Sequence, residues 1–326
     1  MGKKVILLSK YDFAGSGYKI AEAINLNSNN FVLPIVTHTI KYPEGTKRLP
    51  SLFKPDTKLG IKGWFEDISR IQTLINDADI IHFKGDSVPI SDFIDNVKIP
   101  ENKTRIVTVG GSYFRRNNIK GIKPIADIEE YVKRTNYRSA ITPDLLYPEY
   151  CGEFTPHAYP THDFINMWKN KKIPTISHSP SDRITKGTDI IIKASEILKN
   201  EGIDHRLDII ENVSIQESLN RKAKSTIFIG QIDQTMGWYS NSSIEAMAMG
   251  IPTLSYISEE LKQKYCKDIK VVNCGKTAEF VANTIKNILR SDLSKLSKET
   301  YKWVNDFHGY ETIGKMWDSI YTNIKC

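Results

Sequence analysis

Residues 173–200 read IPTISHSPSDRITKGTDIIIKASEILKN, and this stretch carries the pattern that decides the fold. An apolar, β-rich run over 173–179 leads through a polar loop into an amphipathic stretch with helical spacing over 187–200. Short apolar runs that alternate with helices are typical of parallel sheets covered by helices on both faces. The stretch therefore predicts one strand–loop–helix unit of an α/β domain.

The same alternation runs through both halves of the chain and predicts two doubly wound, Rossmann-like α/β domains. It breaks over residues 150–172, which show no clear period, so we place the interdomain linker there. Ligands of such sheets bind at the carboxyl ends of the strands, and two such domains facing each other would form a cleft. The strands are expected at 4–9, 31–38, 79–83, 105–110, 138–142, 173–179, 205–210, 225–232, 251–257 and 269–273.

The composition of the 326 residues is that of an ordinary globular protein. Hydrophobic residues make up 40% and charged residues 25%, which excludes wholesale disorder. No apolar run is long enough to cross a bilayer, and the first one is too short for a signal peptide. Four scattered cysteines without CxxC spacing favour a reducing, cytoplasmic setting over a zinc site or a disulfide framework.

The chain is basic, with 45 Lys and Arg against 38 Asp and Glu and a net charge of +7. The excess suits an anionic ligand, an anionic membrane surface or nucleic acid, and by itself it chooses none of them. The irregular segment 39–62 contains several lysines and one arginine, which either bind a lipid phosphate or are simply solvated. Peripheral membrane contact therefore stays open, whereas no clustered aromatic–basic stripe supports nucleic acid.

The loop within the opening stretch gathers groups suited to a diphosphate. Ser179, Arg183 and Lys186 lie close together in sequence, and Gly187 stands at the expected start of the helix. The cationic side chains would form charge-assisted hydrogen bonds with phosphate oxygens, and the helix N-terminus would add its amides and its dipole. The alternative is a capped helix with two exposed cations.

A second feature, GWYSNSSIEAMAMGIP over residues 237–252, follows a strand that ends in Asp233 and Gln234. Ser242 and Glu245 have the spacing of a capping box, which is a structural interpretation of Glu245. In the functional interpretation this helix N-terminus lies at a strand end, and Glu245 reaches the ribose hydroxyls of a nucleotide.

The first half offers candidates at the ends of three strands. Gly15 and Gly17 form a glycine turn, but Ile20 occupies the third position of a dinucleotide fingerprint, so we reject NAD and FAD. The amides of this turn could hold an acceptor or a phosphate, or the turn is merely tight. His82 is either a proton handler or a core histidine, and Arg115 is either a phosphate contact or a solvated charge.

Together these residues resemble the family-4 retaining glycosyltransferases of the GT-B fold, most specifically over residues 173–257. In that family an Arg and a Lys-Gly pair follow the first strand of the C-terminal domain, as Arg183 and Lys186-Gly187 do here. A helix reading Glu-Ala-Met-Ala-x-Gly-x-Pro comes later, as it does from Glu245 to Pro252. The resemblance implies an acceptor domain over 1–160, a nucleotide-sugar domain over 161–305 and a final helix over 306–326 that packs back onto the first domain.

The resemblance also implies roles for individual residues. Arg183 and Lys186 would bind the donor diphosphate and stabilise its departure, and Glu245 would hold the ribose. Ser112 and Arg115, on the acceptor side, match the family's Gly-Ser-x-x-Arg segment. The implied donor-binding residues are Gly15, Gly17, Ser179, Arg183, Lys186, Gly187, Gln234, Gly237, Tyr239, Ser242, Ser243 and Glu245.

Two positions depart from the family pattern. Gly237 stands eight residues before Glu245, where the family has a Glu that contacts the transferred sugar. Other groups, such as Asp233, Gln234 or Tyr239, would then hold the sugar instead. In the acceptor segment a glycine replaces the family's histidine. The catalytic role toward the acceptor would then fall to two residues, His82 and Asp86.

The sequence thus predicts a glycosyltransferase that moves a sugar from a UDP- or GDP-linked donor to a hydroxyl of a glycan, a lipid-linked acceptor or another molecule. The resemblance implies retention of configuration and no metal, and we expect no cofactor beyond the nucleotide sugar as co-substrate. We expect the protein in the cytoplasm or peripherally at the membrane. Three alternatives stay open: a catalytically weak nucleotide-sugar-binding protein, a nucleotide-sugar epimerase of the same fold, and a transferase acting on a modified nucleic acid base.

Overall fold

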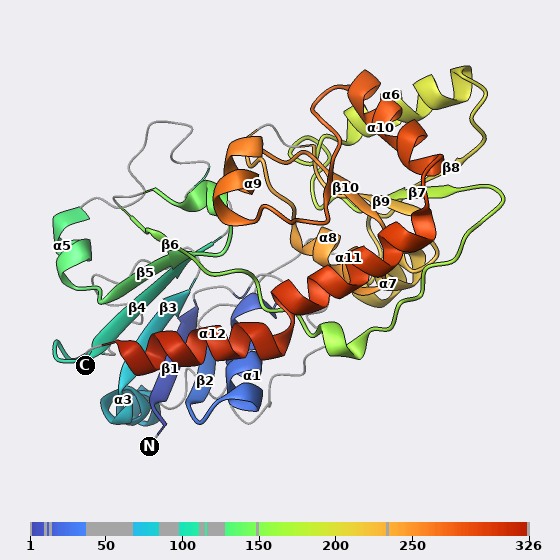
Figure 1. The fold of residues 1–326 in the computed structure, drawn as a ribbon. Coiled ribbons are helices and arrows are strands. Elements are labelled where there is room, and N and C mark those ends of the chain that lie inside the picture. Colours follow the sequence, from blue (N-terminus) through green and yellow to red (C-terminus); the bar gives the residue numbers. More distant parts are fainter. Residues whose placement is uncertain are drawn as a thin grey trace. The chain divides into compact units, whose positions relative to one another are not determined.

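The computed structural model of the chain describes residues 2–9, 12, 15–36, 68–84, 98–110, 115, 128–147, 150–232 and 235–324. These residues form two compact units. The first contains the described residues up to Pro160 together with those from Gly309 onward, and the second contains Thr161–His308. The chain therefore returns to the first unit at its end, where the last helix, drawn red, lies beside the blue first helix (Figure 1).

Six parallel strands form the sheet of the first unit, in the order β2-β1-β3-β4-β5-β6. Nearly every residue of β1, β3 and β4 is buried, which explains their continuous apolar runs. β6 lies in the segment expected to be a linker, because a two-residue strand shows no period. The strands are β1 (Lys4–Ser9), β2 (Phe31–Val36), β3 (Ile80–Lys84), β4 (Thr104–Val109), β5 (Tyr137–Ala140) and β6 (Glu153–Phe154).

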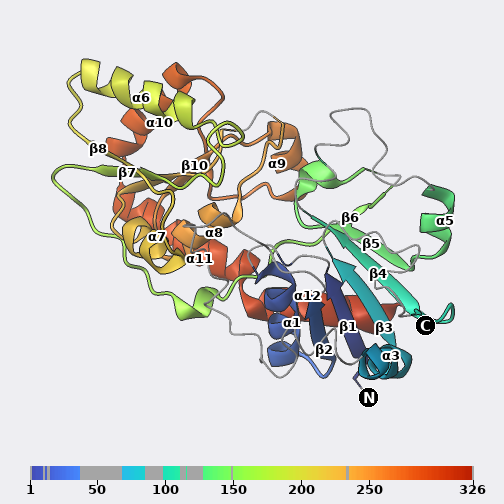
Figure 2. The same ribbon diagram turned by 180° about the vertical axis from the view of Figure 1, so that it is seen from behind.

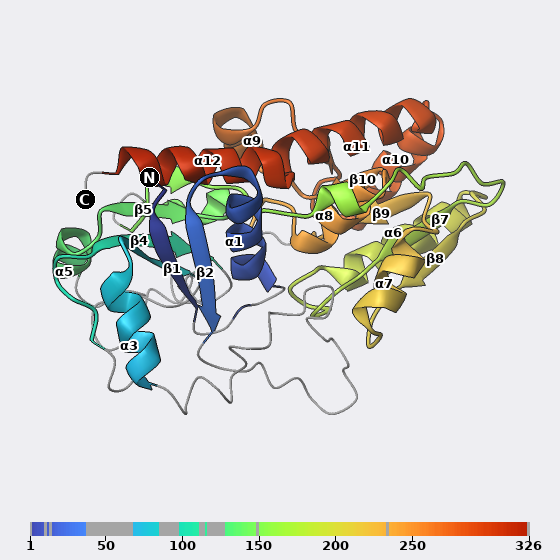
Figure 3. The same ribbon diagram turned by 90° about the horizontal axis from the view of Figure 1, so that it is seen from below.

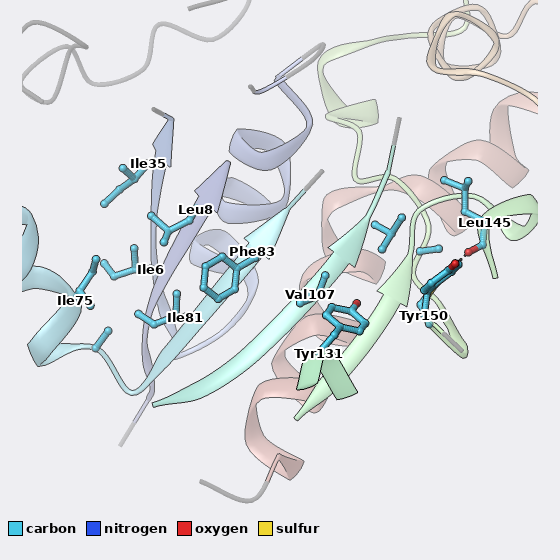
Figure 4. Packing of buried hydrophobic residues seen from close by; sticks show 14 of the residues in the cluster. Ile6, Leu8, Ile35, Ile75, Ile81, Phe83, Val107, Tyr131, Leu145 and Tyr150 are labelled. Carbon is cyan, nitrogen blue, oxygen red and sulfur yellow. Dashed lines mark hydrogen bonds between the residues drawn. The ribbon is translucent and has the colours of Figure 1, made fainter. Parts of the chain in front are cut away.

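Helices cover both faces of this sheet. α1 and α12 share one face, where Ile24 packs with Trp317 and Tyr321, and Figure 3 shows α3 on the opposite side from α12. Figure 4 shows the apolar cluster of that opposite face. The close approach of α12 to α1 requires Gly314, because a Cβ there would overlap the carbonyl oxygen of Ala23. The helices are α1 (Ser16–Asn27), α3 (Ile68–Asp77), α5 (Ile128–Lys133), the 3₁₀ turn η3 (Pro143–Leu145) and α12 (Tyr310–Asn323).

Five parallel strands form the sheet of the second unit, in the order β11-β10-β9-β7-β8. α6 and α10 cover one face around Ile191 and Ile285, and α7 and α8 cover the other around Leu219, Phe228 and Ala246 (Figure 2). The strands are β7 (Thr175–His178), β8 (Arg206–Ile209), β9 (Ile227–Ile229), β10 (Thr253–Ser255) and β11 (Val272–Asn273). The helices are η4 (Thr161–Asp163), α6 (Thr188–Asn200), α7 (Ile215–Lys222), α8 (Asn241–Ala248), α9 (Glu259–Tyr265), α10 (Ala278–Leu289) and α11 (Leu293–His308).

Each sheet reverses its strand order at one point, between β1 and β3 in the first unit and between β7 and β9 in the second. Ser9 lies beside Lys84 in one register and His178 beside Ile229 in the other, so the loops that leave these strands start side by side. Such a switch point is where doubly wound sheets bind ligands. The predicted class, two doubly wound Rossmann-like domains, is confirmed. Among the described helices, none is long and apolar enough to cross a bilayer.

Candidate functional site

The start of α6 is built around Gly187, in the loop expected to bind a diphosphate. Gly187 has a φ of 68°, and a Cβ there would lie 2.9 Å from the Cβ of Ile232 and 3.0 Å from its carbonyl oxygen. The amide of Ile232 also donates a hydrogen bond of 3.2 Å to the carbonyl of Lys186. Only glycine combines this backbone conformation with this close approach. The helix N-terminus therefore packs directly on the segment that follows β9, and no side chain caps it.

Lys186 reaches the same segment with its side chain. Its ammonium group donates to Oε1 of Gln231, two residues beyond the end of β9. Gln231 is buried, and its Nε2 donates a bond of 2.9 Å to the carbonyl oxygen of Trp238. The Gln231 amide thus holds the Lys186 ammonium group at the carboxyl end of β9. A cation at a strand end is what we expected of a phosphate contact.

Arg183 is half-exposed, and a carboxylate already occupies its guanidinium. Its Nε donates a bond of 3.0 Å to Oε2 of Glu211, and its Nη2 donates to Oε1 of the same residue. The guanidinium hydrogen bonds hold the pKa of the Glu211 carboxyl below its usual range. The sequence analysis missed Glu211, although an acidic residue directly after a strand end was a usable signal. A phosphate that binds the Nε and Nη2 edge of Arg183 has to replace this carboxylate.

The N-terminus of α8 offers two hydroxyls without partners. The N-cap residue is Ser240, with no side-chain capping bond, so the expected capping box of Ser242 and Glu245 is wrong. Ser242 lies inside the first turn instead. Within the described residues, Oγ of Ser242 and Oγ of Ser243 are buried and have no hydrogen-bond partner. Buried hydroxyls usually have one, so these two atoms are exceptions among the described residues.

The two helix N-termini meet at one short segment, Gly230–Ile232. Ile232 contacts Gly187 at the start of α6, and Gln231 accepts from Lys186. A Cβ on Gly230 would overlap Oγ of Ser243 at the start of α8, so that hydroxyl lies directly against the backbone. Helix N-termini attract anions through the helix dipole and through amides that have no other acceptor. At α6 the amides of Gly187 and Thr188 already donate to the carbonyls of Ile184 and Arg183, so the dipole and Lys186 carry the attraction there. The end of β9 thus carries the features of an anion site.

Glu245, expected to hold a ribose, is paired with a residue that the sequence analysis did not single out. Nζ of Lys222, at the end of α7, lies 2.5 Å from Oε2 of Glu245. The Lys222 side chain is 2% exposed and that of Glu245 is 13% exposed. Lys222 follows Leu219 by three residues on the buried face of α7, so a lysine in an apolar stripe was the signal available.

Two residues of β7 and its loop serve the framework of the site. His178 is buried, with Nδ1 2.8 Å from the carbonyl of Ile229 and Nε2 3.1 Å from Oγ1 of Thr188. Burial lowers the His178 pKa to about 4, so the ring is neutral at pH 7 and links β7, β9 and α6. Ser179, expected in the donor site, has its Oγ 3.4 Å from that of Ser218.

Gly237 and Tyr239 have structural surroundings that do not suit the expected sugar contact. Gly237 is a buried turn residue with a φ of 58°, and its carbonyl accepts a bond of 2.9 Å from the Ser258 amide. The Tyr239 hydroxyl lies 2.8 Å from Nε2 of His308 inside an aromatic cluster, and burial raises its pKa well above the usual value. The Tyr239 side chain is therefore part of the core and does not contact the donor. Asp233 and Gln234 lie outside the described residues.

His82 is a core histidine, and the prediction of a catalytic role is wrong. Its side chain is fully buried, with Nδ1 2.8 Å from the Tyr321 hydroxyl and Nε2 2.7 Å from Oγ1 of Thr108. The ring of Trp317 lies 4.6 Å away, centroid to centroid. Burial and the charge of Lys84 lower the His82 pKa to about 3. The ring therefore fixes α12 to the sheet and has no path to a substrate.

The glycine turn after β1 is already filled by a carboxylate of the chain. Asp12 accepts hydrogen bonds from the amides of Gly17 (2.7 Å) and Tyr18 (3.1 Å), and Gly15 takes a φ of 63° to start α1. The expected use of these amides for a phosphate is therefore contradicted. Nearby, the ammonium of buried Lys84 donates to Oγ of Ser16 at the switch point.

The remaining acceptor-side candidates divide into one described residue and two outside the description. Arg115 is not a solvated charge, because its Nε donates a bond of 2.6 Å to Oδ2 of Asp144 and its side chain is largely buried. Ser112 and Asp86 lie outside the described residues, so those two expectations stay predictions. In the part of the chain that the structure describes, no three His, Cys, Asp or Glu side chains gather as metal ligands would.

Comparisons with known proteins define the fold. The sequence matches no protein-family model and no curated protein. A solved glycosyltransferase from Rickettsia africae is similar over 99% of both chains, with 14% identity and a TM-score of 0.62. Sucrose-phosphate synthase from Thermosynechococcus elongatus is similar over 98% of both chains, with 12% identity and a TM-score of 0.61. Anabaena HepE in complex with UDP and glucose covers 99% of this chain and 100% of its own, with 10% identity and a TM-score of 0.58.

A putative UDP-N-acetylglucosamine 2-epimerase from Listeria monocytogenes is also similar, with 12% identity, a TM-score of 0.51 and coverage of 97% of this chain and 94% of its own. The shared fold is GT-B, which consists of two Rossmann-like domains. Because these neighbours include transferases and an epimerase, the fold does not decide the chemistry, and the site has to.

Proposed function

We propose that the chain is a glycosyltransferase that moves a sugar from a UDP-sugar to an acceptor hydroxyl. The observation that carries this proposal is the convergence of Lys186 and two uncapped helix N-termini on Gly230–Ile232. The choice of UDP is supported by HepE, which has the same fold and was solved with UDP-glucose.

In the proposed complex the donor diphosphate lies against the first turns of α6 and α8. Lys186 neutralises one phosphate, and the hydroxyls of Ser242 and Ser243, which have no partner within the described residues, donate to its oxygens. Arg183 contributes a second cation after it exchanges Glu211 for phosphate. Glu245, one turn further along α8, accepts hydrogen bonds from the ribose hydroxyls.

The chemistry that we propose is stabilisation of the leaving group. When the bond between the sugar and the diphosphate breaks, its electron pair moves onto the phosphate oxygen. The acceptor oxygen forms the new bond to the sugar and gives its proton to that phosphate oxygen. Lys186 and the helix amides are in place before the reaction and lower the energy of the developing charge. We propose retention of configuration, as the family resemblance implies, and that these groups supply the stabilisation without a metal.

The acceptor is proposed to bind at the switch point of the first unit, near buried Lys84 and Ser16. Its hydroxyl belongs to a glycan, a lipid-linked sugar or another molecule, and in the lipid case the protein would work peripherally at a membrane. Arg115 is proposed to shape this region through Asp144 rather than to contact the acceptor.

The experiment is a panel of UDP-, GDP-, ADP-, dTDP- and CMP-sugars, read by thermal shift and by nucleotide release. We expect a UDP-sugar to raise the melting temperature and to release UDP, and Lys186→Met to lose both responses. Lys302→Met is the matched control, because Lys302 is exposed on α11 and pairs only with Asp306 among the described residues. If no donor changes either readout, the proposal fails.

Product analysis without an acceptor separates the transferase from the epimerase. The transferase proposal predicts slow hydrolysis to the donor's own sugar. A UDP-sugar recovered with inverted configuration at a ring carbon would instead identify an epimerase.

A further inference from the structure

Lys222 stands out because its charge is buried without a role in the site described so far. Nζ is 2.5 Å from Oε2 of Glu245 on one side and 5.6 Å from the ring centroid of Phe228 on the other. The side chain is 2% exposed. Taking both charges of such a pair out of water is expensive, and apolar residues of similar size often stabilise a fold as well. Stability alone therefore explains this pair poorly.

The geometry of the pair allows it a second role, because Lys222 bonds to one of the two carboxylate oxygens of Glu245. Among the described residues, the hydrogen bond to Glu245 is made to Oε2, and Oε1 receives none. The Glu245 side chain keeps 13% of its surface exposed, and in the proposed complex the remaining oxygen faces the ligand. An ionised carboxylate with one oxygen fixed and the other open is suited to accept hydrogen bonds from a pair of neighbouring hydroxyls.

Lys222 is itself held firmly. The preceding residue, Arg221, makes two hydrogen bonds to the Asp208 carboxylate and donates one of 3.1 Å to the carbonyl of Ile209, which ties the end of α7 to β8. Phe228, on β9, is fully buried beneath the ammonium. The carboxylate orientation is therefore set by the framework and does not depend on the ligand.

We propose that Lys222 is a positioning residue that keeps the Glu245 carboxylate oriented toward the ribose, so that the site selects ribonucleoside diphosphates over their deoxy counterparts. This inference rests on the proposed function, since it assumes that a nucleotide binds at the start of α8. It adds to that function the residue that sets the preference for ribose over a sugar that lacks the 2′ and 3′ hydroxyls.

The test is calorimetric titration of the full chain with UDP, 2′,3′-dideoxy-UDP and inorganic pyrophosphate. Wild type is expected to bind UDP about tenfold more tightly than dideoxy-UDP, as hydrogen bonds to a charged acceptor allow. Lys222→Met is expected to bind UDP no better than dideoxy-UDP, with its affinities for dideoxy-UDP and pyrophosphate unchanged. Lys222→Arg keeps the cation and should retain most of the preference.

A double variant guards against misfolding, because Lys222→Met leaves an unpaired buried carboxylate. Lys222→Met with Glu245→Gln removes both charges and should recover melting temperature relative to the single variant. It should still fail to distinguish UDP from dideoxy-UDP. Because the double variant also lacks the Glu245 carboxylate, it controls for folding, and the comparison of Lys222→Met with Lys222→Arg tests the positioning role.

The outcomes separate the two proposals. If Lys222→Met keeps the wild-type ratio of the two nucleotide affinities, or if all three ligands weaken together, the positioning role is overturned while nucleotide binding stands. If wild type binds UDP and dideoxy-UDP equally, Glu245 does not contact the ribose and the inference fails. If wild type binds neither UDP nor pyrophosphate, the proposed function itself fails.

Discussion

Arg183 meets an incoming diphosphate with its guanidinium already bound to Glu211. The two anions compete for one cation, so the carboxylate lowers the apparent affinity for the ligand. Exposed ion pairs of this kind are worth up to about 1 kcal/mol, because water and salt screen them. The ion pair therefore changes the affinity for a diphosphate only within a narrow range and does not prevent binding.

Glu211→Gln is expected to bind inorganic pyrophosphate about two- to fivefold more tightly than wild type, since the competing charge is gone. Titration calorimetry at low salt measures the change. Glu201→Gln, which removes the partner of Lys286 elsewhere in the second unit, should leave the affinity unaltered. Weaker binding by Glu211→Gln would mean that this carboxyl group assists the ligand.

Two of the buried histidines, His82 and His178, make stability depend on pH in a defined direction. The folded-state pKa is about 3 for His82 and about 4 for His178, both below the ordinary 6.5. Below pH 6.5 the unfolded chain takes up protons that the folded chain refuses, so stability falls as pH decreases. Each histidine should cost on the order of 2 kcal/mol between pH 7 and pH 5.

Melting temperatures from pH 7 to pH 5 check this expectation. His82→Gln should flatten the decline, because glutamine does not titrate in this range, whereas His162→Gln should not, since His162 is exposed. A decline that is the same in all three proteins would assign the pH dependence to other groups.

His82 also shows why the roles of some residues could not be predicted from the sequence. It lies in an apolar strand near a predicted strand end, and both interpretations suited that pattern. The hydroxyl that decides between them belongs to Tyr321, 239 residues further along the chain. Tyr239 is a parallel case, because its partner His308 comes from α11. Lys186 and Gly187 were easier, since their roles follow from a local strand–loop–helix pattern.

At the scale of elements, the start of α6 depends on Gly187 for two separate reasons. Gly187→Ala is expected to destabilise the second unit by about 2–4 kcal/mol, since it combines left-handed backbone strain with a clash against Ile232. It should also weaken pyrophosphate binding, because the helix start would move. Urea unfolding and calorimetry report the two effects.

Gly202→Ala is the matched control for this prediction. Gly202 has a φ of 79°, but a Cβ there would have nothing within 4 Å. Its substitution should therefore cost about 1–2 kcal/mol from backbone strain alone, with no effect on binding. Equal losses in the two variants would show that the packing on Ile232 is not tight.

Element positions were predictable where the apolar pattern was long. β1 was placed at its observed bounds, and the runs expected for the other main strands overlap the observed ones. α9 was missed, because none of its residues is buried and it shows no apolar stripe. The capping box was misplaced, since residues 240–243 read Ser-Asn-Ser-Ser and each of these is a good N-cap.

At the scale of the molecule, the two units differ in continuity. Among the described residues the second unit is one stretch, Thr161–His308, whereas the first needs α12 from beyond it. We expect a 161–308 fragment to unfold cooperatively in urea, because it holds its own sheet and cores. A 2–160 fragment should lack cooperative unfolding, since the buried Trp317 and Tyr321 would be missing from its sheet.

Circular dichroism during urea titration distinguishes the fragments. Adding 309–326 in trans, as a peptide, should restore a cooperative transition to the 2–160 fragment. Cooperative unfolding of the 2–160 fragment alone would show that the first unit folds without α12.

The return of α12 to the first unit has a consequence for how the protein is made. A ribosome delivers the chain from its N-terminus, so the strands of the first unit emerge before the second unit, yet the helix that covers them emerges after it. The second unit can close during translation, whereas the first exposes the apolar face later covered by Trp317 until α12 has been synthesised. During that interval the nascent chain exposes an apolar surface that chaperones are suited to bind. A nonsense mutation between residue 308 and Trp317 would leave that surface exposed in the finished protein.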